Sequence, residues 1–342
     1  MLGNNKCVNC GGENTYNPEK GLVCCDRCGS SFPVKERKRR VIKRQYTSMY
    51  SPEENKQETI KYFCDTCGAQ SVVGDDGEIK RCASCGNTSI RKEQSVMVVP
   101  DAIIPFEISR RKAGDIFKKW VHSRKFAPSD LKQMAKLEKI TGLYTPVWNL
   151  NYKTIYTYTG MGIKVKTNSD GKYETVEYPI YKEREDVFED VLKTASSRIT
   201  NNFLDGLGEY DFNKLRPFST DYLLGFVGID TDLNLHDVYN DIVETTSKQN
   251  EKKTRSYLKT EYNQVEAMSY RTRFLDVYFN YTYLPVWANH YIYKGKEYHC
   301  YINGQTGVAT GKAPKSFWKV AGLIGGIVAG VALGILAICL II

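Results

Sequence analysis

The chain has 342 residues, of which 42% are hydrophobic and 25% are charged. This composition is ordinary for a globular protein, and the length allows two or three domains. The formal net charge of +9 makes the chain mildly basic and excludes a polycation built to coat nucleic acid.

Four cysteine pairs near the start of the chain follow the pattern C-x2-C. Within each half of this set, 14 residues separate the two pairs, so the same unit occurs twice. A C-x-x-C pair folds into a tight turn that directs two sulfurs at one metal ion, and the glycine after each pair permits close backbone approach. The predicted ligands are Cys7, Cys10, Cys25 and Cys28 in the first unit and Cys64, Cys67, Cys82 and Cys85 in the second.

This spacing predicts two zinc ribbons, at residues 1–34 and 61–92, each with a β-hairpin between its cysteine pairs. An Asp-Gly pair at 76–77 is a strong turn signal, and a Lys-Gly pair at 20–21 is a weaker one. Four thiolates close a tetrahedral site and leave no position for water. We therefore expect two structural Zn²⁺ ions, with rubredoxin-like iron as the alternative.

The linker between the ribbons, residues 35–60, begins with a basic run. Seven basic residues and one acidic residue lie between positions 35 and 44. The run is either a solvated linker or a contact with an anionic surface, which would be a membrane or a nucleic acid. The residues expected at such a contact are Lys35, Arg37, Lys38, Arg39, Arg40, Lys43 and Arg44.

The body of the chain, residues 96–312, is expected to have an α+β fold. Helices are predicted from Ser109 as N-cap, over 129–140, near 185–200 and after Asn234. The helix near 185–200 depends on apolar residues that recur at every fourth position, namely Val187, Val191, Ala195 and Ile199.

Antiparallel β-hairpins are expected between these helices. Residues 149–160 alternate in the manner of a strand, and 166–178 read as two strand ends around an Asn-Ser-Asp-Gly turn. Residues 288–311 read as a β-meander with turns at 294–295 and 303–304.

A five-residue motif occurs twice in the body. The sequence YTPVW stands at 144–148 and YLPVW at 283–287. Proline at the start of a strand loses no ladder hydrogen bond, and the tryptophan two places on can pack against a helix. Three explanations of this repeat are open: chance, a duplicated α+β half, or two neighbouring strands of one sheet.

No motif of a known catalytic class stands in the sequence. A phosphate loop, a His-Glu-x-x-His helix, a nucleophile elbow and a dinucleotide fingerprint are all missing. His290, His299 and Cys300 lie near one another in the meander, but a tyrosine-rich sheet explains them better than catalysis does. We expect no catalytic residue and no enzyme.

The last 23 residues, 320–342, contain no charged residue. As a helix they would be about 35 Å long, against a hydrocarbon core of about 30 Å, so we predict one C-terminal transmembrane helix, with a buried core helix as the alternative. Lysines precede the segment and no basic residue follows, which predicts a single-pass cell-membrane protein whose N-terminal bulk is cytoplasmic. A seam of small residues would pack against another membrane protein or a second copy: Gly322, Gly326, Gly330, Gly334 and Ala337.

Several longer stretches resemble a known bacterial family. They are the double CxxCG ribbon, PDAIIPFEIS, FKKWVHSRKFAPSDL, YDFNKLRPFSTDYLLGF and LPVWANHYIYKGKEYHCYINGQTG. The family is described as membrane proteins with a transcription-factor-IIB-type zinc ribbon, and the chain is similar to its YdjG-type branch in Firmicutes. The resemblance covers nearly the whole chain. It implies genes for an SPFH (flotillin-like) protein and a TPM-domain protein nearby, and a membrane-stress assembly of the phage-shock kind.

These observations predict a membrane-anchored cytoplasmic zinc-ribbon scaffold or adaptor, with the SPFH-type protein as partner. Only the eight cysteine ligands carry over from the resemblance, which supplies no catalytic residue. A membrane-tethered protein that binds nucleic acid through its ribbons and basic run is the alternative. The predicted fold is two small β ribbons, an α+β body with antiparallel meanders, and one transmembrane helix.

Overall fold

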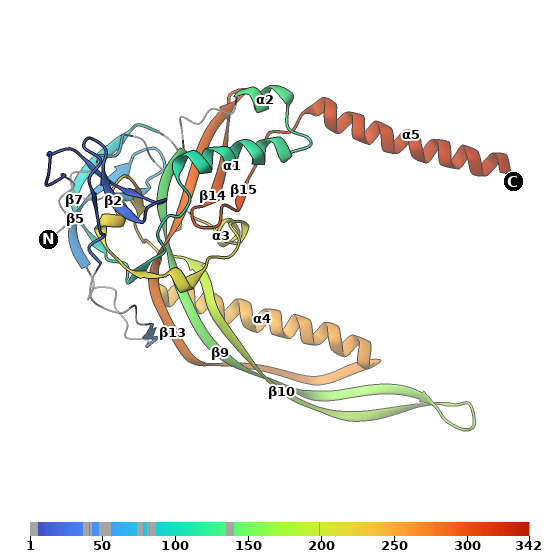
Figure 1. The fold of residues 1–342 in the computed structure, drawn as a ribbon. Helices are drawn as coiled ribbons and strands as arrows, with labels where there is room; N and C mark the ends of the chain where they lie inside the picture. The colour runs from blue at the N-terminus through green and yellow to red at the C-terminus, as the bar shows by residue number, and fades with distance from the viewer. Residues whose placement is uncertain are drawn as a thin grey trace.

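The computed structural model describes the chain except residues 1–5, 37–40, 42, 48–55, 74–77, 81, 83–86, 135–139, 198 and 342 (Figure 1). The described residues form a small three-stranded sheet, a twelve-stranded sheet and five α-helices, the last of which extends away from the sheets (Figure 1). The small sheet consists of β1 (Asn14–Asn17), β2 (Leu22–Cys25) and β3 (Ser31–Phe32).

The large sheet is antiparallel for most of its extent and runs in the order β11-β8-β13-β9-β12-β6-β5-β7, with β4, β10, β14 and β15 attached to this path. Its strands are β4 (Arg44–Gln45), β5 (Lys56–Cys64), β6 (Gln70–Val73), β7 (Ile90–Val98), β8 (Ala102–Ile103), β9 (Ile140–Thr167), β10 (Tyr173–Thr194), β11 (Arg216–Pro217), β12 (Val227–Ile229), β13 (Gln264–Tyr293), β14 (Lys296–Asn303) and β15 (Ala309–Gly311). The helices are α1 (Arg110–Ser123), α2 (Ser129–Met134), α3 (Asn201–Gly206), α4 (Leu235–Glu261) and α5 (Phe317–Ile341), with short 3-10 helices η3 (Phe212–Lys214) and η4 (Thr220–Leu223).

Two predicted helices begin where the sequence places them. Ser109 caps α1 by accepting a hydrogen bond from the Lys112 backbone N–H, and Asn234 caps α4 by accepting one from His236. Both caps are local interactions, and this explains why they can be recognised in the sequence.

The two copies of the repeated motif lie side by side. The first three residues of each copy, Tyr144–Pro146 of β9 and Tyr283–Pro285 of β13, pair with each other in antiparallel register. The indole of Trp148 donates a hydrogen bond to the Leu233 carbonyl (3.1 Å). The indole of Trp287 donates one to the Ile108 carbonyl (2.8 Å). Each carbonyl belongs to the residue just before the N-cap of a helix, so the two tryptophans fix the starts of α4 and α1 on the sheet.

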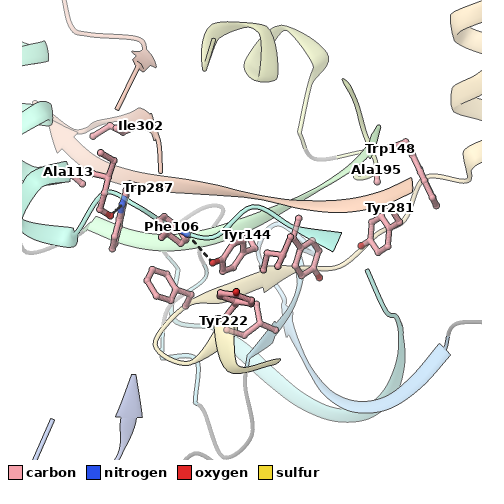
Figure 2. Close-up of a cluster of buried hydrophobic side chains, with 14 of the residues drawn as sticks. Phe106, Ala113, Tyr144, Trp148, Ala195, Tyr222, Tyr281, Trp287 and Ile302 are labelled. Atoms are coloured by element: carbon pink, nitrogen blue, oxygen red, sulfur yellow. Dashed lines mark hydrogen bonds between the residues drawn. The ribbon is translucent and has the colours of Figure 1, made fainter. Parts of the chain in front are cut away.

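The largest cluster of the core is rich in aromatic residues and extends along the strands from Ala113 and Trp287 to Trp148 and Tyr281 (Figure 2). The rings of Phe106 and Phe226 stack at 4.3 Å, and Trp287 packs on Phe106 at 4.9 Å. The hydroxyl of buried Tyr144 accepts a hydrogen bond from the Phe106 backbone N–H, so the one polar atom of this ring has a partner.

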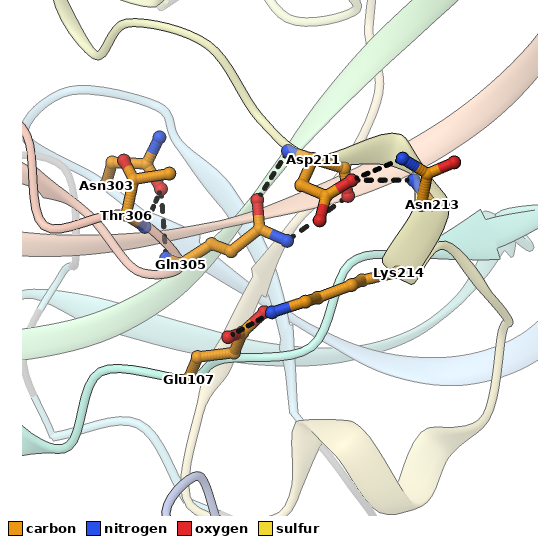
Figure 3. A network of polar contacts seen from close by, with 7 residues as sticks. All are labelled: Glu107, Asp211, Asn213, Lys214, Asn303, Gln305 and Thr306. Atoms are coloured by element: carbon orange, nitrogen blue, oxygen red, sulfur yellow. Dashed lines mark hydrogen bonds and ion pairs between the residues drawn. The ribbon is translucent and has the colours of Figure 1, made fainter.

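A polar clamp holds the turn after β14 to the loop before η3 (Figure 3). The Asn303 side chain accepts hydrogen bonds from the backbone N–H groups of Gln305 and Thr306. The amide of Gln305 in turn exchanges two hydrogen bonds with the backbone of Asp211, at 2.8 and 3.2 Å. An ion pair between Lys214 and Glu107 (2.8 Å) lies beside the clamp. The predicted turn at 303–304 therefore also positions residues far away in the chain.

Three strands of the large sheet extend beyond the rest of the molecule (Figure 1). We call residues 152–188 of β9 and β10, with 264–275 of β13, the arm. The helix α4 covers one face of the arm, where the Arg255 guanidinium lies over the Tyr270 ring and Arg184 donates a hydrogen bond to Asn250. The other face carries no helix in Figure 1.

The prediction of a helix near 185–200 is wrong. Residues 185–194 belong to β10, in which Val187 pairs with Lys153 and Val191 with Leu150 of β9. Residues spaced four apart lie on one face of a helix but also on one face of a strand, so spacing alone could not separate the two. Of the helix predicted over 129–140, the described residues show α2 at Ser129–Met134 and place Ile140 at the start of β9, while 135–139 lie outside the described residues.

The predicted fold class is wrong in its proportion of helix to strand. An α+β body with separate ribbons was expected, but the described residues are mostly β and the second cysteine unit is part of the twelve-stranded sheet. The sequence shows short strands between helices, whereas β9, β10 and β13 each continue for more than twenty residues because they pair with one another.

The predicted transmembrane helix is a further correction. Residues 317–341 form α5, which extends away from the sheets (Figure 1). In the part of the chain that the structure describes, no helix combines the length and the apolar character needed to cross a membrane.

Candidate metal centres

The first cysteine unit brings its four predicted ligands together. The sulfurs of Cys7, Cys10, Cys25 and Cys28 all lie within 4.8 Å of one another. The Cys7 and Cys28 sulfurs are 3.7 Å apart, and those of Cys10 and Cys25 are 3.5 Å apart. Four sulfurs about 2.3 Å from one tetrahedral ion lie about 3.8 Å from each other. The cluster thus has the size of a site that holds one metal ion.

The turns that present these sulfurs are formed by local backbone hydrogen bonds. The Gly11 N–H donates to the Cys7 carbonyl (2.8 Å), and the Gly29 N–H donates to the Cys25 carbonyl (3.0 Å). Both glycines have positive φ, 68° and 74°, a conformation that residues with a side chain rarely adopt. The glycine after each cysteine pair is therefore required by the turn itself.

The second unit brings together three of its four predicted ligands in the described residues. The sulfurs of Cys64, Cys67 and Cys82 lie within 4.8 Å of one another, and those of Cys67 and Cys82 are 3.6 Å apart. Cys85 lies outside the described residues, as does the predicted turn at 76–77. Gly68 repeats the turn of the first unit, with φ of 65° and a hydrogen bond to the Cys64 carbonyl.

One thiol of the first unit is activated before any metal binds. Hydrogen bonds from the Ser30 hydroxyl and the Ser30 backbone N–H lower the pKa of Cys28 to about 6, because they stabilise the thiolate. Since the thiolate is the form that binds metal, this sulfur is ready as a ligand at neutral pH. The neighbouring Cys24 contacts Ser31 instead and takes no part in the cluster.

Both units are joined to the body. The Tyr16 backbone of β1 donates a hydrogen bond to the Leu224 carbonyl, and the Tyr16 ring packs edge-on against Tyr222 at 5.1 Å. In the second unit, β6 pairs with β12, and Lys61 of β5 forms a buried ion pair with Asp230 (2.5 Å). The metal units are therefore supports of the sheets and not modules on flexible tethers.

The described part of the basic run is tied to carboxylates of the body. The Lys35 backbone N–H donates to Asp221, Lys43 pairs with Asp190 (3.0 Å), and Arg44 pairs with Asp101 (2.6 Å). Residues 37–40, which include the other predicted contact residues Arg37, Lys38, Arg39 and Arg40, lie outside the described residues. Lys43 and Arg44 thus already have anionic partners within the chain.

The predicted seam of α5 meets no neighbour within this chain at its described positions. A Cβ built on Gly322, Gly326 or Gly330 would have no heavy atom within 4 Å, and the same holds for Gly325, which lies off the row. Gly334 and Ala337 lie where the side chains are not described. The structure therefore shows no packing difference between the row and its neighbour.

The predicted neighbours His299 and Cys300 do not form a couple. Consecutive residues of β14 point to opposite faces of the sheet, and Cys300 lies fully buried opposite Asn289. Burial raises the pKa of the Cys300 thiol to about 12, which keeps it protonated and unreactive at neutral pH.

An ion pair and a pair of exposed arginines were not predicted from the sequence. Lys61 and Asp230 are far apart in the chain, and nothing local marks them as partners. The open face of the arm carries Arg271 and Arg273, whose alternation in SYRTRF does place both side chains on one face of a strand. This alternation could have predicted a pair of arginines on one face of the strand.

Fold and site together define a largely β protein with two cysteine clusters of metal-site geometry, one complete and one described at three positions. In sequence the chain is similar to the uncharacterized protein YdjG of Bacillus subtilis (strain 168), with 27% identity over 345 residues, 98% of this chain and 97% of that protein. No protein-family model matches the chain. No solved structure matches it either.

Proposed function

We propose that this protein is a scaffold that two structural zinc ions stabilise and that binds a protein partner on its arm, with no catalysis of its own. Zinc suits the clusters because four thiolates around a tetrahedral site close the coordination sphere. Such a site supports folding and leaves no open position for substrate. The integration of both units into the sheets favours this structural role.

The observation that carries the proposal is the uncovered face of the arm. This face is hollowed, with a volume of about 310 Å³. Three strands contribute to the hollow, so its shape depends on the paired sheet and not on a loop. The lining residues are Thr157, Thr159, Tyr181, Glu183, Ser269, Arg271 and Arg273.

The chemistry of this face indicates an acidic partner with some apolar surface. Arg271 and Arg273 are both exposed. Glu183 is the single carboxylate among the residues that line the hollow. Val187 and Leu275, farther along the same face, are 59% and 39% exposed. Apolar side chains beside a pair of guanidinium groups are typical of a protein-binding surface. The resemblance to the zinc-ribbon family suggests an SPFH-type protein as the partner.

A charge-reversal experiment tests the proposal. The double variant Arg271→Glu and Arg273→Glu should lose its partner in crosslinking and co-purification from the native cell. The matched control is Lys118→Glu with Lys119→Glu, which makes the same charge change on exposed positions of α1. Equal partner recovery from both variants would contradict a role for the arm.

Nucleic acid is the competing ligand and can be tested on the same protein. Lys43 and Arg44 are engaged with Asp190 and Asp101, which weakens the basic run as a phosphate-binding surface. A titration with DNA and RNA over a range of salt concentrations should show only weak binding. Micromolar binding at physiological salt with a steep salt dependence would favour the nucleic-acid function instead.

A further inference from the structure

The hairpin of β13 and β14 places two histidines directly opposite each other. His290 and His299 are cross-strand partners, the ring centroids are 4.6 Å apart and the ring planes meet at 80°. The two Nδ1 atoms are 2.6 Å apart, so one ring donates a hydrogen bond and the other accepts it. Both side chains are half-buried and therefore reachable from solvent.

The surrounding sheet holds the two rings in this arrangement. The hairpin is in continuous register from Val286 and Asn303 to the tight turn at Lys294-Gly295. Tyr301 packs edge-on against His290 and lies parallel to His299, each at 6.2 Å. An arrangement that is fixed before binding lowers the entropic cost of capturing a ligand between the two rings.

Two imidazole nitrogens at this separation are close to the geometry of a chelate. Nitrogens about 2.1 Å from one ion, at a right angle, lie about 3.0 Å apart. A small rotation of either ring about its side-chain bonds opens the observed 2.6 Å to that distance. A tautomer change that moves the shared proton from Nδ1 to Nε2 of the donor ring leaves both Nδ1 atoms as acceptors that can bind a cation.

We propose that His290 and His299 form a third metal site, separate from the cysteine clusters, that binds a divalent transition-metal ion through the two Nδ1 atoms. Imidazole nitrogen is a good ligand for Zn²⁺, Ni²⁺ and Cu²⁺. The thiolates of the cysteine clusters are softer ligands and suit zinc. Water completes the coordination, since the two rings supply two ligand atoms to the ion. Tyr301 acts as a positioning residue that orients both rings.

Nickel is the probe of choice because it does not oxidise the thiols of the ribbons. Untagged, zinc-loaded, full-length protein would be titrated with Ni²⁺ by equilibrium dialysis, with its zinc content measured before and after. We expect one Ni²⁺ per chain to bind in the micromolar range, without loss of zinc. His290→Gln and His299→Gln should each weaken this binding at least tenfold.

The two remaining histidines provide matched controls. His122 of α1 and His236 of α4 lie elsewhere on the molecule, so His122→Gln and His236→Gln should leave Ni²⁺ binding unchanged. Tyr301→Phe, which keeps the ring, should also retain it. As a second readout, Ni²⁺ should broaden the imidazole proton NMR signals of His290 and His299 before those of the other two.

Three results would overturn the site. Ni²⁺ binding that is undetectable at millimolar concentration would leave a hydrogen-bonded histidine pair only. Equal loss of binding in His122→Gln and His299→Gln, or exchange of Ni²⁺ for ribbon zinc, would assign the binding elsewhere. Circular dichroism and the zinc content of each variant verify that the fold is intact, so a loss of binding reports on the site. None of these results bears on the arm surface.

Discussion

At the scale of single residues, the contact with the most consequence is the buried ion pair between Lys61 and Asp230. Its side chains are 9% and 4% exposed, and the pair joins the second cysteine unit to the loop after β12. Burial raises the pKa of Asp230, and the adjacent Lys61 ammonium offsets part of this rise. A buried pair stabilises little by itself, but the loss of one partner leaves an uncompensated charge.

The variant Lys61→Met should therefore lower the free energy of unfolding by about 3–5 kcal/mol. Urea unfolding of the full chain measures this. The control is Lys214→Met, which breaks an exposed pair with Glu107 and should change the stability little, because solvent screens exposed ion pairs. Equal effects of the two variants would show that Asp230 does not need its partner.

The loss of stability in Lys61→Met should depend on pH in a defined direction. Because the pKa of Asp230 is raised in the folded state, the folded chain holds this proton more tightly than the unfolded chain does. Stability from this group is present at low pH and is lost as the pH rises through the folded-state pKa. The deficit of Lys61→Met should thus be smaller at pH 4 than at pH 7 in urea unfolding. A deficit that grows on acidification would contradict this.

At the scale of elements, irregular positions shape the long strands. The registers of β10 and β13 shift between Phe188 and Val191, between Glu266 and Ser269, and between Leu275 and Tyr278. Each shift contains a non-glycine residue at positive φ, namely Asp190, Ala267 and Asp276, with φ of 49°, 51° and 49°. Bulges of this kind increase local twist, so these three positions bend the strands that form the arm.

Ala267 offers a direct test of this backbone geometry. A left-handed conformation costs an ordinary residue about 1–2 kcal/mol, whereas glycine adopts it without strain. We expect Ala267→Gly to leave the stability unchanged or to raise it by up to about 1 kcal/mol, after the entropic cost of glycine is subtracted. Ala309→Gly, in the regular strand β15, should lower it. Thermal unfolding compares the two, and a large loss with Ala267→Gly would argue against the bulge.

We expect the fold of the second cysteine unit to depend on a bound metal ion. Cys64→Ser should remove one metal equivalent per chain and loosen β6 with its partner β12, since these two strands are paired. Cys24→Ser, outside the first cluster, should retain both equivalents. Native mass spectrometry counts the metal, and amide hydrogen exchange reports on β12. Full metal content in Cys64→Ser would exclude this cysteine as a ligand.

At the scale of the whole molecule, we expect the two cysteine units and the body to unfold as one cooperative structure. The first unit packs against the body through Tyr16, and the second shares the twelve-stranded sheet through β6 and β12. If such a unit unfolds, the body is left with an unpaired strand edge and with aromatic rings exposed to water. Metal binding should therefore stabilise the body as well as the ribbons.

Removal of metal by a chelator should lower the unfolding temperature of the entire chain in calorimetry. The physical reason is that metal bound only to the folded state adds its binding free energy to the stability. A separate small transition, with the main transition unchanged, would mean instead that the units melt independently. Readdition of zinc should restore the original curve.

The sequence alone determined what depends on neighbouring residues. The C-x-x-C turns close within a few positions through hydrogen bonds that glycine N–H groups donate, so the sequence identified the four cysteines that gather in the first cluster, such as Cys7 and Cys28, and three of the second. The side chains of Ser109 and Asn234 cap their helices within three residues, so both helix starts were correct.

Only the tertiary structure decided what depends on distant residues. Val187 and Val191 became strand residues because β9 was available to pair with them, and the ion pair of Lys43 with Asp190 joins residues that are far apart in the chain. The same pairing of distant segments set Lys61 beside Asp230 and, across a hairpin, His290 against His299. Spacing in the chain carries no record of such contacts, since they form only when the long strands take their register.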